Sequence, residues 1–206
     1  MSLAGELARL GSATVYEASG REGLLDVDLR AVIPGARACG PARTVRCGQG
    51  DNLMVHAAMA RVQPGEVLVL TMPDPAPVAL IGDLLATQAK ARGAAAVLVD
   101  AAVRDSEELA GMGLPIWSRW VRARGATKTV VGELDVPVRV GGQEIRPGDL
   151  VVLDADGGTV VAADRAEEVL QASRAREEKE TVKRAELEAG ALSYELDGLR
   201  AIVEGQ

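Results

Sequence analysis

The chain has 206 residues, 48% of them hydrophobic, and a formal net charge of -7 at pH 7. That length and apolar content allow one buried core, so we expect residues 1–206 to form a single domain. The acidic balance argues against nucleic acid as a partner, because such binding needs clustered lysine and arginine, and the sequence has no apolar run long enough to span a membrane.

The first 20 residues are expected to be helical. Leu3–Leu10 and Ala13–Ser19 carry the patterns of two short helices, and Ser12 is placed to cap the second one. Met1–Leu10 contains an early glutamate and no basic, long apolar signal core, so we expect a cytoplasmic protein.

Residues 21–164 are expected to form an α/β core. Strand patterns occur at Ala36–Cys47 and Glu66–Thr71, and a helix is predicted between them from Asp51 to about Val62. This helix carries the only histidine of the sequence, His56, which we interpret as a packed or surface residue rather than a ligand.

The stretch from Pro77 to Asp105 has the pattern of one strand, one helix and a second strand. The first strand, Val78–Ile81, is closed by Gly82, the helix is predicted from Asp83 to about Lys90, and the second strand is Ala95–Val99. Parallel strands joined by a helix end at the same edge of a sheet, where open α/β sheets bind ligands. We therefore expect the residues that follow the two strands to meet.

Charged residues follow both of these strands. Asp83 leaves the first strand, and Arg104 and Asp105 leave the second. Two carboxylates suit a hard divalent cation such as Mg²⁺ or Mn²⁺, and the free amides of residues 82–85, at a helix start, are donors for a small carboxylate. The residues alone leave an alternative open, in which Asp83 is only a helix cap and Arg104 and Asp105 form only an ion pair in a loop.

The second half of the chain is expected to be rich in strands. The predicted strands are Lys128–Val131, Val136–Val140 and Leu150–Leu153. Asp154–Gly158 has the acidic pattern of a calcium loop but lacks the downstream glutamate, so we predict a tight hairpin turn. Trp117 and Trp120 share one short strand, where a place in the core or in a subunit contact is favoured over a place in a site.

Residues 165–190 are predicted to form a long helix followed by a tail. Opposite charges are dense along it, so it can bury little of its own surface, and we expect it to lie across a neighbouring subunit. Glu177, Glu178 and Glu180 belong to this charged stretch, where exposure to solvent is the ordinary role of a glutamate.

The helix start Gly-Asp-Leu-Leu-Ala at Gly82, followed by Arg104 and Asp105, resembles the class II pyruvate aldolases that cleave 4-hydroxy-4-methyl-2-oxoglutarate and 4-carboxy-4-hydroxy-2-oxoadipate. That family also includes the ribonuclease E activity regulator A proteins. Similar motifs run through most of the chain, among them GDNLMVHAAM, RGATKTVVGELDVPV and PGDLVVLDADGGTVV. The resemblance implies a single-domain β/β/α swivelling-type fold with a parallel strand-helix-strand core, a β-rich second half and a long C-terminal helix. It also implies ring-shaped homotrimers or hexamers.

The resemblance gives each residue of the charged set a role. Asp105 would bind the metal directly, Asp83 would hold a metal-bound water, and Arg104 would contact the keto oxygen of a 2-oxo acid. The pyruvyl carboxylate of the substrate would accept hydrogen bonds from the backbone amides of Gly82, Asp83, Leu84 and Leu85.

Two further contributions are implied by the resemblance. A carboxylate of the neighbouring subunit would approach the water shell of the metal, and Glu180 is favoured over Glu177 and Glu178 for this role. Asn52 lies in a segment that is near the site in the family, and it is a candidate for the surroundings of the site.

The implied reaction is retro-aldol cleavage of a 4-hydroxy-2-oxo diacid to pyruvate through an enolate, with oxaloacetate decarboxylation as a side activity. We expect no histidine or lysine near the site, so the base would be a water held by the metal, Asp83 and the partner's glutamate. Ala101 stands where active relatives usually have glycine, and its methyl group is expected to narrow or alter the pocket. The alternative function is that of a non-catalytic regulator, which binds a ribonuclease or another protein.

Overall fold

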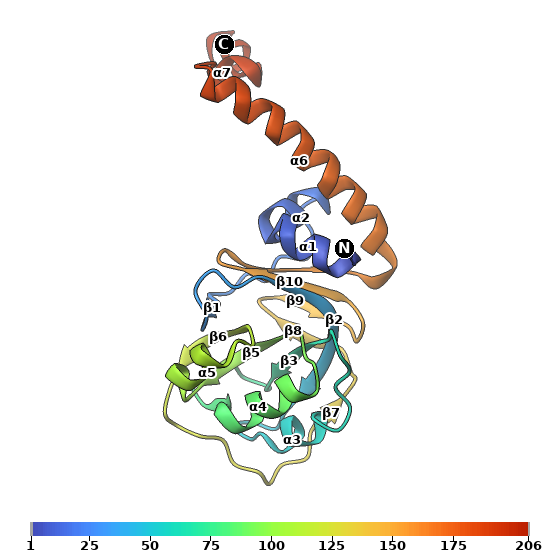
Figure 1. Ribbon diagram of the computed structural model, residues 1–206, viewed down its shortest axis with the longest axis vertical. Helices are drawn as coiled ribbons and strands as arrows, with labels where there is room; N and C mark the ends of the chain where they lie inside the picture. Colours follow the sequence, from blue (N-terminus) through green and yellow to red (C-terminus); the bar gives the residue numbers. More distant parts are fainter. Residues whose placement is uncertain (1, 206) are drawn as a thin grey trace.

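The computed structural model describes residues 2–205 and contains a large mixed sheet with helices packed against it (Figure 1). Within these residues nine strands form the sheet, and two more form a separate hairpin. The strands of the sheet are β1 (Arg30–Ala31), β2 (Ala38–Arg46), β3 (Val67–Thr71), β4 (Ala79–Ile81), β5 (Ala96–Val103), β6 (Ile116–Val121), β7 (Glu133–Leu134), β10 (Leu150–Asp154) and β11 (Gly157–Val161), and the hairpin consists of β8 (Val138–Val140) and β9 (Gln143–Ile145). The helices are α1 (Leu3–Leu10), α2 (Ser12–Ala18), α3 (Leu53–Ala58), α4 (Asp83–Ala91), α5 (Ser106–Met112), the 3₁₀ turn η1 (Ala163–Arg165), α6 (Ala166–Glu188), α7 (Ser193–Leu196) and α8 (Leu199–Glu204). The predicted α/β class, with a β-rich second half and a long C-terminal helix, is confirmed.

The parallel part of the sheet brings the two charged turns together. β2 pairs with β3, β3 with β5, and β5 with β6, all in parallel. β5 continues to Val103, past the predicted end at Val99, and β4 pairs in parallel with its last residues, so that Ile81 lies opposite Val103. Because both strands end at this point, Gly82 and Arg104 leave the sheet side by side.

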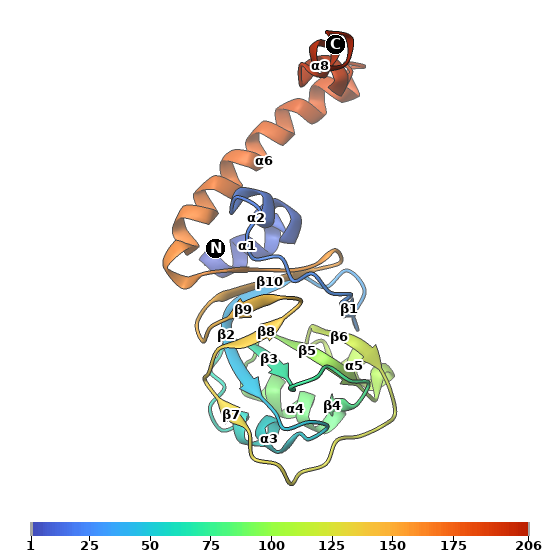
Figure 2. The same cartoon turned by 180° about the vertical axis from the view of Figure 1, so that it is seen from behind.

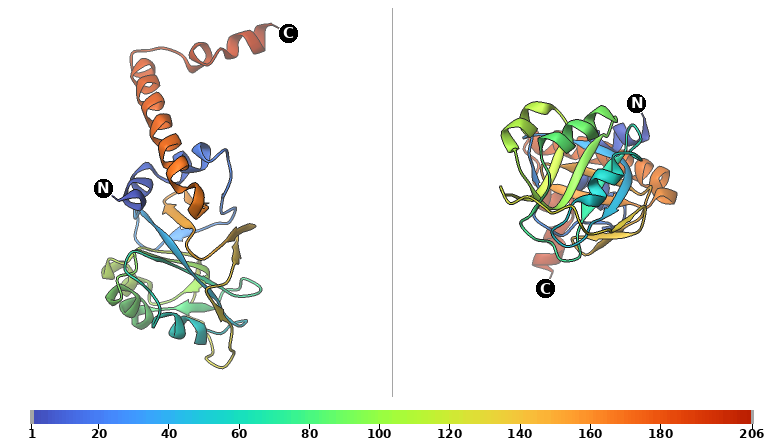
Figure 3. Two further views of the ribbon diagram at one scale, coloured as in Figure 1. Left: turned by 90° about the vertical axis from the view of Figure 1, so that its right-hand side faces the viewer. Right: turned by 90° about the horizontal axis from the view of Figure 1, so that it is seen from below.

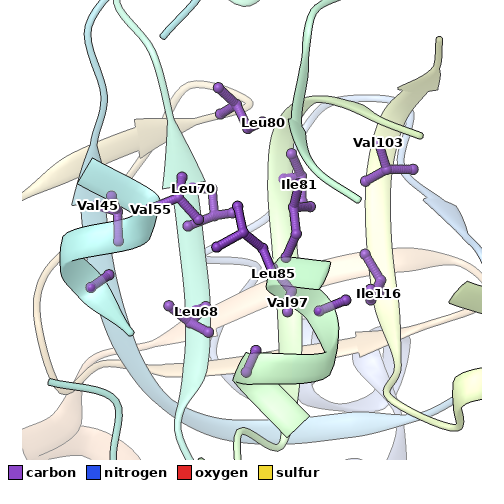
Figure 4. Packing of buried hydrophobic residues seen from close by; sticks show 14 of the residues in the cluster. Val45, Val55, Leu68, Leu70, Leu80, Ile81, Leu85, Val97, Val103 and Ile116 are labelled. Carbon is purple, nitrogen blue, oxygen red and sulfur yellow. The ribbon is translucent and has the colours of Figure 1, made fainter. Parts of the chain in front are cut away.

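Three helices, α3, α4 and α5, cover one face of the parallel strands (Figure 1). α4 buries Leu85, Ala86 and Ala89 and leaves Leu84 exposed, which is the spacing of a helix with one apolar side. Leu85 lies among the buried side chains of the sheet, near Leu70 and Val97 (Figure 4). Burying a leucine side chain contributes roughly 1.5–3 kcal/mol, so Leu85 helps to fix the first turn of α4.

The opposite face of the sheet packs on the β8–β9 hairpin. Trp117 is fully buried in this second cluster, and its indole Nε1 donates a hydrogen bond to the backbone oxygen of Asp154 at 2.8 Å. Trp117 is therefore a core residue, the role that the sequence favours. Trp120 is only partly buried, and the guanidinium carbon of Arg119 lies 4.8 Å from the centre of its ring.

The hairpin of β10 and β11 contains the tight turn that was expected at Asp154–Gly158. The buried Asp154 carboxylate accepts hydrogen bonds from the backbone nitrogen and the hydroxyl of Ser12, at 2.7 and 2.6 Å, and from the backbone nitrogen of Asp156 at 3.0 Å. These bonds fasten α2 to the sheet. The expected cap at Ser12 is wrong, because Ser12 is the first helical residue and Gly11 precedes it as the cap.

Two predicted elements differ from the structure. α3 ends at Ala58 rather than near Val62. Residues 128–131 form no strand, because the backbone amides of Thr129 and Val130 donate hydrogen bonds to the side chain of Asp51 instead of to a neighbouring strand. The segment between β6 and β7, to which these residues belong, crosses the end of the molecule farthest from α6 (Figure 2).

α6 projects away from the sheet, and α7 and α8 turn off sharply from its end (Figure 3). Its first turns pack near α1 and α2, where Arg9 pairs with Glu177 at 2.6 Å and Arg174 pairs with Glu6. Large apolar side chains of the remaining arm stay exposed, among them Val182, Leu192, Ile202 and Val203. Within residues 2–205, no helix is both long and apolar enough to cross a membrane.

Asp100 in β5 makes the stability of the fold depend on pH. Its side chain is 3% exposed, and its Oδ1 lies 3.2 Å from Nη1 of Arg119. Burial raises the pKa of the Asp100 carboxyl to about 6, and the charge and hydrogen bond of Arg119 offset this effect only in part. Since the folded chain then binds this proton more tightly than the unfolded chain, stability falls as the pH rises from about 4 to above 6.

We expect Asp100→Asn to remove this pH dependence. Between about pH 4.5 and about pH 8, the wild-type chain should lose roughly 2 kcal/mol more of its free energy of unfolding than the variant loses. Urea unfolding at the two pH values measures the difference. Asp156→Asn, at an exposed aspartate, is the control, and equal losses in the wild type and Asp100→Asn would contradict the assignment.

Candidate functional site

Gly82 allows the turns after β4 and β5 to approach each other closely. A Cβ atom at this position would lie 2.3 Å from Oδ2 of Asp105 and 3.0 Å from Cγ of Arg104. The φ angle of Gly82 is -140°, which any residue can adopt, so the glycine is required by space and not by backbone conformation. The two charged residues thus fill the volume that a side chain at position 82 would occupy.

Asp105 has its carboxylate turned toward the start of α4. It precedes α5 with φ at 58° in the left-handed region, and its side chain makes no capping hydrogen bond to that helix. Its Oδ2 instead accepts a hydrogen bond from the backbone nitrogen of Asp83 at 3.2 Å. Uncommon backbone conformations of this kind cluster at functional sites, so Asp105 is a candidate for a role beyond the start of α5.

Arg104 lies between the two turns. Its backbone nitrogen donates to the oxygen of Ile81 at 3.2 Å, and its Nε lies 3.4 Å from Oδ2 of Asp105. A Cβ atom on Gly125 would be 2.7 Å from Nη1 of Arg104, so a second glycine makes room for the guanidinium. The side chain of Arg104 is 49% exposed, which leaves its other nitrogens accessible to a ligand.

The start of α4 has fewer free donors than the sequence suggests. The backbone nitrogen of Asp83 is bonded to Asp105, and that of Leu84 donates to Oδ1 of Asp83 at 2.7 Å. The backbone nitrogens of Gly82 and Leu85 have no hydrogen-bond partner within residues 2–205. Two of the four predicted amides are therefore free to donate hydrogen bonds to an anion.

A pocket of about 100 Å³ adjoins this helix start. It is lined by Asn52, His56, Ala79, Ile81, Gly82, Asp83, Leu84, Leu85, Arg104, Ala126 and Lys128. Asn52 is buried, and its Nδ2 donates to the backbone oxygen of Leu80 at 2.9 Å. Its Oδ1 is buried with no partner within residues 2–205, which is costly unless a ligand or a water supplies a donor. The pocket is therefore suited to a polar occupant.

His56 and Lys128 both line this pocket, so the expectation that no histidine or lysine lies near the site is wrong. His56 comes from α3, and Lys128 comes from the loop that was predicted to be a strand. Burial, and in second place the charge of Lys128, lower the pKa of His56, so that its imidazole is neutral at pH 7. No sequence pattern signals this meeting, because the loop crosses the sheet end only in the folded chain.

Ala101 does not narrow the pocket, contrary to expectation. Its side chain is fully buried in the cluster between the sheet and α3, α4 and α5, and it is not among the residues that line the pocket. Successive residues of a strand point to opposite faces, so Ala101 shares its face with Val99 and Val103. The methyl group therefore packs in the core and does not face the pocket.

The acidic residues of α6 lie far from the site of their own chain. Glu180 pairs with Arg176 at 2.8 Å, and Glu177 pairs with Arg9. Figure 1 shows α6 at the opposite end of the molecule from α4. Within residues 2–205, no group of three or more histidine, cysteine, aspartate or glutamate side chains is placed to hold a metal. Asp83 and Asp105 nevertheless form a set of hard oxygen donors that fits Mg²⁺, which takes one or two carboxylates and keeps several waters.

These features define an α/β protein with a polar pocket at the carboxyl end of its parallel strands. A family model described as "RraA-like: Aldolase/RraA" matches residues 12–161, and the chain belongs to this RraA-like family. The fold and the resemblance expected from the sequence are thereby confirmed.

The chain is similar to several known proteins. A protein of Halalkalibacterium halodurans, named as a proposed 4-hydroxy-4-methyl-2-oxoglutarate aldolase, is 38% identical over 165 residues, which are 80% of this chain and 76% of that protein. The crystal structure of Streptomyces coelicolor RraAS2, described as an unusual member of the RNase ES inhibitor RraA family, is 33% identical, with a TM-score of 0.78 over 88% of this chain and 95% of that one. An uncharacterized protein of Pseudomonas syringae pv. tomato is 27% identical, with a TM-score of 0.84 over 92% and 90% of the two chains. The similarity to the Halalkalibacterium protein supports a lyase of the aldolase type.

Proposed function

We propose that the protein is a divalent-metal-dependent lyase that cleaves 4-hydroxy-4-methyl-2-oxoglutarate and 4-carboxy-4-hydroxy-2-oxoadipate to pyruvate, and that it decarboxylates oxaloacetate as a side activity. The observation that carries this proposal is that Arg104 and the start of α4 line one pocket and that the Asp105 carboxylate contacts both of them. The name given to the Halalkalibacterium relative supports the same chemistry.

Asp105 and Asp83 are the residues that would hold the metal, Asp105 directly and Asp83 through a water. Oδ1 of Asp105 accepts no hydrogen bond within residues 2–205, and the same is true of Oδ2 of Asp83. Each carboxylate thus keeps one oxygen available. A Mg²⁺ or Mn²⁺ ion bound there supplies a Lewis acid for a 2-oxo acid.

Arg104 and the free amides of α4 would bind and orient the pyruvyl half of the substrate. The amides of Gly82 and Leu85 lie at the positive end of the helix dipole, which favours binding of the carboxylate. The guanidinium of Arg104 offsets the negative charge that develops on the keto oxygen when the bond between C3 and C4 breaks. Decarboxylation of oxaloacetate develops the same enolate and needs no further group.

The proton of the 4-hydroxyl has two acceptors in this arrangement. Asp83 would hold a water at its free oxygen, and His56 lines the same pocket in its neutral form. Lys128 supplies a positive charge on the wall that carries His56, and it would attract the second carboxylate of a diacid.

We also propose that the site is completed in a homotrimer or hexamer. The side chain of Glu180 belongs to a helix that projects away from the rest of its own chain, so it can approach a site only in another copy (Figure 3). Glu180 of the partner subunit would then add a carboxylate to the water shell of the metal.

Pyruvate release tests the proposed function. The purified protein is given each of the two hydroxy-oxo acids and oxaloacetate, with Mg²⁺ or with a chelator, and pyruvate is measured by coupling to lactate dehydrogenase. We expect Mg²⁺-dependent pyruvate from all three, because each passes through the enolate that Arg104 faces. The absence of pyruvate from every substrate in the presence of Mg²⁺ or Mn²⁺ would reject the proposal.

A non-catalytic regulator that binds a ribonuclease or another protein is the second candidate function. It is favoured by the similarity to RraAS2 and by the exposed apolar side chains of α6 to α8. A protein with only this function would release no pyruvate in the assay, whereas removal of residues 190–206 would weaken its binding to the partner.

A further inference from the structure

Asp51 is fully buried and holds together the parts of the chain that form one wall of the pocket. Its Oδ1 accepts a hydrogen bond from the backbone nitrogen of Leu53 at 2.8 Å. Its Oδ2 accepts four more, from the hydroxyl of Thr127 at 2.7 Å, from the backbone nitrogen and the hydroxyl of Thr129 at 2.6 and 3.4 Å, and from the backbone nitrogen of Val130 at 3.1 Å. Asp51 itself is not among the residues that line the pocket.

These bonds are strong because the carboxylate stays ionised. Burial by itself would raise the pKa of Asp51, but the hydrogen bonds from the backbones of Thr129 and Leu53 outweigh it and hold the pKa well below its ordinary value. Hydrogen bonds to an ionised acceptor are roughly twice as strong as those between neutral groups. Loss of the charge would therefore weaken the attachment of the loop to Asp51.

Lys128 lies between two residues whose groups Asp51 binds. The loop around it belongs to no strand, and its other fixed points are the backbone bonds of Thr127 to Gly50 at 3.0 Å and to Asn52 at 2.9 Å. Asn52, which follows Asp51 directly in the chain, lines the pocket, and its buried Oδ1 has no partner within residues 2–205. One buried carboxylate thus fixes the backbone on both sides of the pocket wall formed by Asn52 and Lys128.

We propose that Asp51 is a positioning residue that sets substrate affinity by holding Lys128 against the pocket. This inference rests on the proposed function, in which Lys128 attracts the second carboxylate of a 4-hydroxy-2-oxo diacid. Most of the hydrogen bonds that Asp51 accepts come from the loop that carries Lys128, so we expect its effect on substrate affinity to disappear when Lys128 is absent.

A double-mutant cycle tests this dependence. We expect Asp51→Asn to raise the KM for 4-hydroxy-4-methyl-2-oxoglutarate about tenfold, with kcat within about threefold, since the bonds of Arg104 and Asp105 are untouched. In the background of Lys128→Met, the same change should raise KM no further. Thr127→Val removes only the hydroxyl donor, so it should raise KM by a smaller factor and keeps the test open if Asp51→Asn folds poorly.

Asp149→Asn is the matched control, because Asp149 is also buried and accepts backbone hydrogen bonds, from Arg146 at 2.8 Å and Ala163 at 3.2 Å, away from the pocket. Its KM should equal that of the wild type. An unchanged KM in Asp51→Asn, or an equal rise in KM with and without Lys128, would overturn the positioning role while the lyase activity stands. Absence of pyruvate from the wild-type protein would instead remove the proposed function and this inference with it.

Discussion

Replacement of Asp105 by asparagine is expected to weaken divalent-metal binding strongly and to remove most of the metal-stimulated pyruvate release. Asp105 offers the carboxylate with one free oxygen at the meeting point of Gly82, Asp83 and Arg104. Removing one direct ligand should weaken Mn²⁺ binding by roughly 100-fold or more, since even outer partners of metal ligands contribute 10-fold to 100-fold. Loss of the Lewis acid should lower kcat by about 1,000-fold, which corresponds to several kcal/mol.

Asparagine is the informative substitution at this position. It tolerates the left-handed conformation that Asp105 adopts, whereas alanine would add backbone strain. Mn²⁺ binding followed by electron paramagnetic resonance measures the site without reference to turnover, and urea unfolding shows whether the fold is kept. Glu108→Gln, at an exposed carboxylate of α5, should bind Mn²⁺ as the wild type does. Undiminished Mn²⁺ binding in Asp105→Asn would show that the ligand is another residue.

Replacement of Arg104 by alanine should lower kcat by roughly 100-fold to 1,000-fold, because one preorganised donor at a developing oxyanion contributes about that much. The affinity for Mn²⁺ should stay the same or rise slightly, since a positive charge is removed from beside Asp105. Steady-state kinetics with oxaloacetate and the same Mn²⁺ titration separate the two effects.

Arg104→Lys provides the comparison for this variant. It keeps the charge but not the planar fork of nitrogens, so its kcat should fall between those of the wild type and Arg104→Ala. Arg122→Ala, at an exposed arginine next to the same strand end, should leave kcat unchanged. A loss of Mn²⁺ affinity that matches the loss of kcat in Arg104→Ala would contradict a role at the keto oxygen and indicate a role in binding the metal.

The fold follows closely from local patterns in the sequence. The apolar run before Gly82, the acidic helix start at Asp83 and the second apolar run predict the strand, helix and strand that the structure contains. Turn residues likewise predict the hairpin at Asp154–Gly158. Such signals are short-range, because glycine, capping residues and alternating burial act on neighbours in the chain.

The secondary-structure predictions are wrong where a side chain that is distant in the sequence replaces the expected local hydrogen-bond partner. Residues 128–131 have the composition of a strand, yet Asp51, far away in the chain, takes the hydrogen bonds of their backbone. Ser12 has the chemistry of a helix cap, yet Asp154 binds its hydroxyl and draws it into the helix as its first residue. Propensity and pattern carry no information about these long-range partners.

By itself, the sequence determined the α/β class, the two charged turns and the meeting of these turns, with Asp83 on one and Arg104 and Asp105 on the other, at one edge of the sheet. These follow because parallel strands joined by a helix have only one handedness and one common end. Only the tertiary structure decided that Ala101 faces the core, that two of the four amides are already bonded, and that His56 and Lys128 share the pocket. The reason is physical: which face a strand residue takes after a register shift, and which loop crosses a sheet end, depend on packing among elements that are far apart in the chain.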